Sequence, residues 1–276
     1  MDTTLPTSCL PDFDLVDRLP SLAAGEGRLV VGAPGAPGRP SLLFVHGAFH
    51  GAWCYAGYLE YFAALGIGCA AVDLPGHGWL PQTQAFHRYG VRDFGRCVAQ
   101  AMDLIDGPVV VAGHSMGALP ALFAATQRDV AGVVLMAPSP PGNVPGAQAL
   151  APVPLGASRV PPGLEDIRRR FTGGLGKHEL AEVAARLSPE SAEAMNDRYL
   201  LRLDIPAQAI SAPGLCLEAG EDDAARHPPG QDKAVADLYG FEYRLLSGLP
   251  HCMMYARGWQ ESAEAIRDWY ERHFPA

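Results

Sequence analysis

Hydrophobic residues in the chain follow two patterns that alternate along the sequence. Several short runs are continuously apolar, which is typical of strands that are covered on both faces of a sheet. Between them lie longer segments whose apolar side chains recur at roughly helical spacing. The alternation predicts an α/β fold with a mostly parallel central sheet flanked by helices. The predicted strands include residues 41–45, 69–72, 109–112, 131–137, 214–219 and 242–246, and the predicted helices include 52–65, 91–105, 231–239 and 259–274.

The start of the chain carries a weaker version of the strand pattern. Residues 10–18 and 28–32 alternate partly between apolar and polar positions and are separated by Pro and Gly. Short alternating segments of this kind are typical of strands at the edge of a sheet. Both segments are therefore predicted to be edge strands.

The composition changes after residue 137. Residues 138–162 are crowded with Pro, Gly and Ala, and helical patterns follow at 164–171, 179–187 and 189–203. Such a stretch is too long for a plain connection and too apolar for a linker. We predict that residues 138–211 form an inserted helical lid, and that 1–137 and 212–276 form the core. Ser188 and Pro189 are predicted to begin the last lid helix, as its N-cap and first helical residue.

Composition narrows the class of protein. The chain has 276 residues, of which 48% are hydrophobic and 18% charged, as in globular proteins with a large core. Its net charge of −9 argues against nucleic acid or an anionic membrane as the main partner, because both attract basic surfaces. No stretch reaches the roughly 18 to 20 apolar residues of a membrane span, and residues 1–22 lack the pattern of a signal peptide.

The cysteines indicate a reducing environment. The six are scattered without a Cys-x-x-Cys pair, mostly in apolar runs. Buried, reduced thiols fit this arrangement better than disulfides or a zinc site. We therefore expect a cytoplasmic protein without a metal or an organic cofactor.

One segment carries a recognisable nucleophile motif. The predicted strand 109–112 runs into Gly113-His114-Ser115-Met116-Gly117, and an Ala- and Leu-rich helical segment follows. In a Gly-x-Ser-x-Gly turn between a strand and a helix, the serine has a strained backbone and its Oγ projects above the sheet. The motif alone is weak, because Gly and Ser are common in turns. Its placement favours Ser115 as a nucleophile.

A serine nucleophile needs a base and a group that orients the base. In the chain order serine, acid, histidine, the candidates stand just after predicted strands: Asp223 follows the strand 214–219, and His251 follows the strand 242–246. The carboxyl ends of parallel strands meet at one edge of the sheet, so all three residues are expected there. Asp222 remains the alternative acid.

Five motifs in this order resemble the α/β-hydrolase family, in particular its lidded esterase, lipase and methylesterase-like branch. Residues 46–53 (His-Gly-Ala-Phe-His-Gly-Ala-Trp) look like the oxyanion loop of that family, and residues 73–78 (Asp-Leu-Pro-Gly-His-Gly) like its next turn. Residues 113–117 look like its nucleophile elbow, 220–223 like its acid turn, and 251–255 like its histidine loop. The resemblance covers the chain from about residue 41 to the end, apart from the lid.

The resemblance implies a role for each of these residues. Ser115 would attack a carbonyl carbon, His251 would accept its proton, and Asp223 would orient His251, since the usual acid stands three residues past the glycine that ends the strand. Backbone N–H groups of Ala48 and Met116 would bind the oxyanion.

Other residues near these motifs carry weaker expectations. Phe49 and His114 are candidates for the wall of the substrate pocket, although either could instead fill the core. His46 and His77 are expected to be structural, bonded to backbone groups of their own loops.

The predicted function is therefore hydrolysis of an ester or thioester of a hydrophobic small molecule through an acyl-enzyme. Three alternatives stay open: an acyltransferase or cyclising thioesterase with the same triad, a carbon–carbon bond hydrolase, and a ligand-binding relative without turnover. The sequence leaves open the substrate identity and the oligomeric state.

Overall fold

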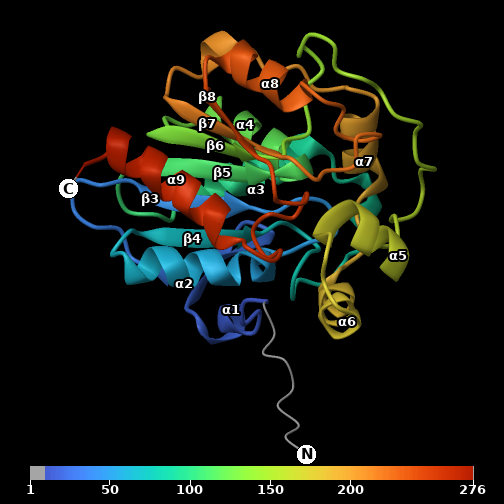
Figure 1. Cartoon of the computed structure of the whole chain (residues 1–276), viewed down its shortest axis with the longest axis horizontal. Coiled ribbons are helices and arrows are strands. Elements are labelled where there is room, and N and C mark those ends of the chain that lie inside the picture. Colours follow the sequence, from blue (N-terminus) through green and yellow to red (C-terminus); the bar gives the residue numbers. More distant parts are fainter. Residues whose placement is uncertain (1–9, 276) are drawn as a thin grey trace, which may run out of the picture.

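The computed structural model describes residues 10–275, and within them eight strands form a single sheet. The strand order is β1-β2-β4-β3-β5-β6-β7-β8, with β1, β2 and β4 paired antiparallel and all other neighbours parallel (Figure 1). The predicted α/β fold with a mostly parallel sheet is confirmed. The strands are β1 Ser21–Ala24, β2 Gly27–Ala33, β3 Ser41–Val45, β4 Cys69–Asp73, β5 Val109–His114, β6 Gly132–Met136, β7 Gly214–Ala219 and β8 Glu242–Leu246.

Helices cover both faces of the sheet. Helices α2 and α9 contact each other, as do α3 and α4, and the two pairs form the layers on either side of the sheet (Figure 1). Helix α8 packs on β7 and β8. These core helices are α2 Ala56–Ala64, which continues the 3-10 turn η1 Ala52–Tyr55, α3 Val91–Met102, α4 Ala118–Ala125, α8 Gln231–Tyr239 and α9 Gln260–His273; a further 3-10 turn, η2, spans Phe86–Arg88.

The N-terminal edge differs from the prediction. The strand predicted over residues 10–18 is wrong, because Leu15–Arg18 form the short helix α1. The edge strand that follows is instead Ser21–Ala24, which pairs with β2 around the turn at Gly25. Gly25 has a φ of +60°, a conformation that glycine adopts without steric cost, so the hairpin turn forms at the glycine.

The segment between β6 and β7, which we call the inserted segment (residues 138–211), contains short helices gathered at one end of the sheet (Figure 1). Its elements are α5 Leu164–Ile167, the π-helical turn η4 Arg168–Thr172, α6 Lys177–Arg186, α7 Ala192–Tyr199 and the 3-10 turn η5 Ala207–Ala209. The predicted start of its last helix is wrong: the N-cap of α7 is Ser191, whose Oγ accepts the Ala194 N–H, and not Ser188.

The described cysteines are buried free thiols, as expected: Cys54, Cys69, Cys97, Cys216 and Cys252. Cys9 lies outside the described residues. Burial raises the pKa of the Cys252 thiol, so the neighbour of His251 stays protonated at neutral pH. In residues 10–275, the longest apolar helices fall short of what a membrane crossing requires.

Candidate active site

Ser115 occupies a sharp turn between β5 and the helix that leads into α4. The 3-10 turn η3 spans Ser115–Gly117, and Ser115 itself has a φ of +52°. For a residue with a Cβ this left-handed conformation is strained, and such strain is typical of functional turns. The strained backbone turns the Ser115 side chain into the cavity described below.

The glycines around this turn are required by close backbone contacts. A Cβ added to Gly117 would lie 2.2 Å from the carbonyl oxygen of His46, and one on Gly113 would lie 2.6 Å from the carbonyl oxygen of Gly117. A Cβ on Gly47 would lie 2.9 Å from the Ser115 Cβ. The elbow and the loop after β3 therefore touch through their backbones, which brings Ala48 beside the nucleophile.

His251 links Ser115 to a carboxylate. The Ser115 hydroxyl lies 2.9 Å from His251 Nε2, within hydrogen-bond distance, and His251 Nδ1 lies 2.6 Å from Asp222 Oδ2. His251 and Asp222 are largely buried, with side chains 6% and 8% exposed. The order serine, imidazole, carboxylate is the arrangement that activates a serine in acyl transfer.

The expectation that Asp223 orients His251 is wrong. The carboxylate of Asp223 accepts hydrogen bonds from Arg169 Nη1 at 3.0 Å and from the Ala225 N–H, and it has no bond to His251. Asp222, the alternative acid, takes that position because its turn is fixed from outside: the N–H of the preceding Glu221 donates to the Leu249 carbonyl. This bond ties the acid turn to the chain just before His251.

The charge state of the pair follows from its surroundings. Burial alone would raise the pKa of the Asp222 carboxyl, but His251, His227 and the Asp223 N–H together outweigh burial and hold that pKa below its usual range. The Asp223 N–H also donates to Asp222 Oδ1 at 2.6 Å. Asp222 is therefore ionised at neutral pH and accepts the His251 Nδ1 proton, which leaves Nε2 free to accept the serine proton.

His114 bonds the backbone of the loop that carries His251. Its Nε2 donates to the carbonyl oxygen of His251 at 2.9 Å, and its side chain is buried. Burial, and the proximity of His251, lower the pKa of His114 well below its usual value, so the ring is neutral. His114 borders the cavity, but the bond it makes is to the loop backbone.

The predicted oxyanion donors lie on two sides of Ser115. Met116 follows Ser115 in the first helical turn, where backbone N–H groups have no partner within the helix, and Ala48 comes from the loop after β3. Both residues line the cavity with Ser115. Phe49, next to Ala48, also lines the cavity and has a φ of +70°, which is unusual for an aromatic residue.

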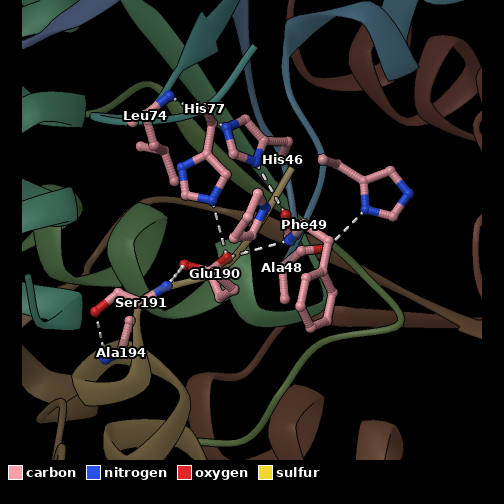
Figure 2. Close-up of polar contacts among 12 residues, drawn as sticks. His46, Ala48, Phe49, Leu74, His77, Glu190, Ser191 and Ala194 are labelled. Atoms are coloured by element: carbon pink, nitrogen blue, oxygen red, sulfur yellow. Dashed lines mark hydrogen bonds and ion pairs between the residues drawn. The ribbon is translucent and has the colours of Figure 1, made fainter. Parts of the chain in front are cut away.

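Glu190 holds this unusual conformation in place. Its side chain is 1% exposed, and one carboxylate oxygen accepts the Phe49 N–H at 3.2 Å and His77 Nε2 at 3.0 Å (Figure 2). The other oxygen accepts the Ser191 N–H at 2.7 Å. A second bond runs from the Ser188 N–H to the Phe49 carbonyl at 2.9 Å. The inserted segment thus binds both backbone groups of Phe49.

His46 and His77 lie behind this loop, and each bonds a backbone carbonyl of its own loop, as predicted, and also a group of another segment. His46 bonds the Gly47 carbonyl through Nδ1 and accepts the Leu74 N–H on Nε2. Both ring nitrogens of His77 face oxygen acceptors, on Pro75 and Glu190. Burial would lower the pKa of His77, but Glu190, with smaller contributions from the Pro75 carbonyl and Asp73, outweighs burial and raises that pKa above its usual value.

A cavity of about 570 Å³, counted out to its open mouth, surrounds Ser115. Part of the wall is apolar, and part of it carries three arginines. The apolar side chains are Phe49, Met116, Leu150, Phe171 and Met195, and the arginines are Arg170, Arg198 and Arg226.

One group of side chains in the cavity has donor atoms close enough for a metal ion. Asp222, His227 and His251 each offer an atom within 4.8 Å of the others. His251 Nδ1 and Asp222 Oδ2, however, face each other at hydrogen-bond distance, which leaves no room for an ion between them. Their chemistry is that of an acid–base pair.

Two parts of this site, Glu190 and the three arginines, are not among the site residues predicted from the sequence. The sequence pattern places Glu190 at a helix start, and the arginines come from three separate segments. The feature that marks Glu190 as part of the site is its buried pairing with His77. The two residues are 113 positions apart in the sequence, so this pairing can be recognised only in the folded structure.

Comparisons with known proteins agree with this architecture. Residues 42–265 match the alpha/beta hydrolase family. A stretch of 89 residues, 31% of this chain, is 30% identical to Methylesterase 4 of Arabidopsis thaliana. This match spans about a third, 34%, of the length of that curated relative.

Solved structures resemble the whole fold. The tomato methylketone synthase I complexed with 2-tridecanone has a TM-score of 0.67 at 17% identity, over 85% of this chain and 99% of that chain. A thioesterase domain from the curacin biosynthetic pathway has a TM-score of 0.62 at 18% identity, over 91% of this chain and 98% of that chain. At these identities the likeness concerns the fold. Together with the match that extends over residues 42–265, it establishes that the chain belongs to the alpha/beta hydrolase family.

Proposed function

We propose that the protein is a serine hydrolase that cleaves an ester or thioester through an acyl-enzyme. The observation that carries this proposal is the hydrogen-bonded series from Ser115 through His251 to Asp222 at the edge of a cavity. Membership of the alpha/beta hydrolase family supports it.

In the first half-reaction, the Ser115 Oγ attacks the carbonyl carbon while His251 Nε2 accepts the hydroxyl proton. The Asp222 carboxylate stabilises the imidazolium and holds its Nδ1–H. The bond between the carbonyl carbon and the alcohol or thiol then breaks, and His251 returns the proton to the leaving group. The acyl group remains on Ser115.

In the second half-reaction, water replaces the leaving group. His251 accepts a proton from the water as its oxygen attacks the acyl carbon, and it then protonates Ser115 as the carboxylic acid leaves. Backbone N–H groups of Ala48 and Met116 would bind the oxyanion in both steps; in other enzymes, one such donor contributes about 3 kcal/mol.

The inserted segment would act as the cover of this site. It supplies Leu150, Phe171 and Met195 to the apolar wall, which excludes water and provides contacts for an apolar part of the substrate. The tomato methylketone synthase I binds 2-tridecanone, a hydrophobic ligand, on the same fold, which supports an apolar substrate portion.

Labelling with a fluorophosphonate probe, followed by turnover of 4-nitrophenyl esters, tests the proposal. We expect the wild type to label and hydrolyse, and Ser115→Ala and His251→Ala to do neither. Ser247→Ala and His178→Ala are matched controls, because both side chains are exposed outside the cavity. These two variants should behave as the wild type.

Each other outcome points to one of the alternatives. A wild type that labels but does not turn over esters in water would favour transfer of the acyl group to another acceptor. A wild type that does not label would refute the activated serine and favour a ligand-binding relative.

A further inference from the structure

Three arginines line the cavity of Ser115 from separate parts of the chain. Arg170 lies in η4 and Arg198 in α7, both in the inserted segment, and Arg226 lies in the loop after β7. The guanidinium carbons of Arg198 and Arg226 lie 5.8 and 5.7 Å from the centroid of the same ring, that of Tyr199. Two cations are thus held close together at one side of the cavity.

The hydrogen bonds of these arginines go to neutral groups. Arg198 Nε donates to the Ser139 hydroxyl at 3.0 Å and its Nη2 to the Arg226 carbonyl at 3.1 Å. Arg226 Nη1 donates to the Tyr199 hydroxyl at 2.7 Å. Arg170 lies over the ring of Phe171, 5.2 Å from its centroid.

Buried donors of two arginines remain without a partner. Arg198 is only 4% exposed, yet its Nη1 has no hydrogen-bond acceptor, and the same holds for Arg170 Nε. A buried unsatisfied donor on a charged group is costly, and native structures retain such groups chiefly where a ligand or function uses them. An acceptor that enters the cavity would satisfy them.

The carboxylates nearest to these arginines do not pair with them. Among the described residues, no Asp or Glu oxygen lies within 4.0 Å of the guanidinium groups of Arg170, Arg198 or Arg226, whereas the adjacent Arg169 pairs with both Asp166 and Asp223. Asp222, the other acid of the cavity, is bonded to His251. The three guanidinium groups therefore face only more distant carboxylates, such as Asp223 and Asp232.

The arginines also weaken one another's charged forms. Burial, and the nearby Arg226, lower the pKa of Arg198 to about 10 and lower the pKa of Arg170 as well. Both groups still carry a proton at neutral pH. A bound anion would relieve this repulsion and supply the missing acceptors.

We propose that Arg170, Arg198 and Arg226 form a binding site for an oxyanion group of the substrate, a carboxylate or a phosphate. The planar guanidinium donates paired hydrogen bonds to either group. This inference rests on the proposed function, and it assigns the substrate class: an ester or thioester that carries a negative charge on the part held away from Ser115.

The test compares three 4-nitrophenyl esters of similar acyl length: the neutral pentanoate, the hemiglutarate with a terminal carboxylate, and the 4-phosphonobutanoate. We expect the wild type to have a higher kcat/KM for at least one charged ester than for the pentanoate. The charged ester with the larger kcat/KM identifies carboxylate or phosphate as the preferred group.

Variants then assign the preference to the arginines. Arg226→Gln and Arg170→Gln should each lower kcat/KM for the preferred charged ester by about 10- to 100-fold, the effect of one lost hydrogen bond to a charged group, and leave the pentanoate within a few-fold. Arg202→Gln is the matched control, because Arg202 pairs with Glu193 and lies outside this cavity.

Failure of this inference differs from failure of the proposed function. Labelling by the neutral fluorophosphonate together with equal or better turnover of the pentanoate would overturn the anion site alone. Equal losses on neutral and charged esters in the arginine variants would also overturn it, because that result indicates a structural role. Absence of labelling and of turnover on every ester would overturn both.

Discussion

Replacing Glu190 with Gln should reveal how strongly the inserted segment holds the oxyanion loop. The two oxygens of the Glu190 carboxylate accept three donors, from Phe49, His77 and Ser191, in a site that is almost closed to solvent. An amide has a single carbonyl oxygen, and its NH₂ group would face a donor. At least one buried donor therefore loses its acceptor in the variant, and the charge opposite His77 disappears.

The expected cost follows from these losses. Removal of the hydrogen bond between charged groups costs about 1.5 to 3 kcal/mol, and a buried unsatisfied N–H costs about 1 to 3 kcal/mol more. Loss of one partner from a buried ion pair typically costs about 3 to 5 kcal/mol in total. We therefore expect Glu190→Gln to lower the free energy of unfolding at pH 6 by roughly 3 to 5 kcal/mol.

This cost should depend on pH through His77. Because the pKa of His77 is raised in the folded protein, its pairing with Glu190 contributes fully below the pKa of the unfolded chain, about 6.5. The contribution is lost as the pH rises through the folded pKa of His77. The difference in stability between wild type and Glu190→Gln should therefore be larger at pH 6 than at pH 9.

Activity should fall as well, because the Phe49 N–H loses its anchor beside Ala48. The loss in kcat has an upper bound of about 100- to 1000-fold, the effect of a whole oxyanion donor in other enzymes. KM should change little, since Glu190 does not line the cavity.

Urea unfolding at pH 6 and pH 9, together with kcat on a 4-nitrophenyl ester, measures these effects. Glu193→Gln is the control, because Glu193 pairs with Arg202 near the surface and such pairs contribute about 0 to 1 kcal/mol. A loss below about 1 kcal/mol for Glu190→Gln at pH 6, or an equal loss at both pH values, would refute the reasoning.

Two further pairs of variants test the catalytic acid and the elbow. Asp222→Asn should lower kcat by about 1000- to 10,000-fold, because it favours the wrong His251 tautomer, whereas Asp223→Asn should stay within a few-fold; kinetics with the reverse order would exclude Asp222 as the orienting acid. Gly117→Ala should destabilise the protein by about 1 to 3 kcal/mol in thermal unfolding, because its Cβ would meet the His46 carbonyl. Gly174→Ala, where nothing lies within 4 Å of the added Cβ, should change stability by less than about 0.5 kcal/mol, and equal Tm values for the two glycine variants would contradict the packing argument.

The sheet and the elbow could be predicted because their signals are local. The strands β3, β5 and β6 are mostly apolar runs that are buried along their whole length. The turn at Ser115 is indicated by the glycines beside it. Helical spacing and a glycine stop are likewise read within a single segment. The family resemblance added the order of these local motifs, the expected oxyanion donors and the rule that selected Asp223.

The acid could not be selected in the same way. Asp222 and Asp223 are neighbours after one strand, and a rule that counts residues from the end of the strand selects Asp223. The backbone direction at Asp222 depends on the bond between Glu221 and Leu249, which are 28 residues apart and belong to different loops. A contact between two loops decides which carboxylate faces His251. Counting residues along one loop gives no information about that contact.

Contacts that are distant in sequence also decide the structure of the inserted segment, where the pattern Ser188-Pro189-Glu190 resembles a helix start. In the structure these residues precede the helix, and their groups are used by the oxyanion loop instead. A positive φ at a bulky residue such as Phe49 costs about 1 to 3 kcal/mol and persists only where its surroundings fix it. Residues 188 and 190 supply that fixation through both backbone groups of Phe49.

Two separate sets of contacts link the inserted segment to the cavity. Through Arg170 and Arg198 it provides charged groups of the cavity wall, and through residues 188–190 it fixes the backbone next to Ala48. Substitutions at the wall can change which substrates fit without disturbing the oxyanion loop, because the two sets of residues do not overlap. In the proposed mechanism a change at Glu190 should act on every substrate alike, because the backbone next to Ala48 would bind the oxyanion whatever acyl group is present.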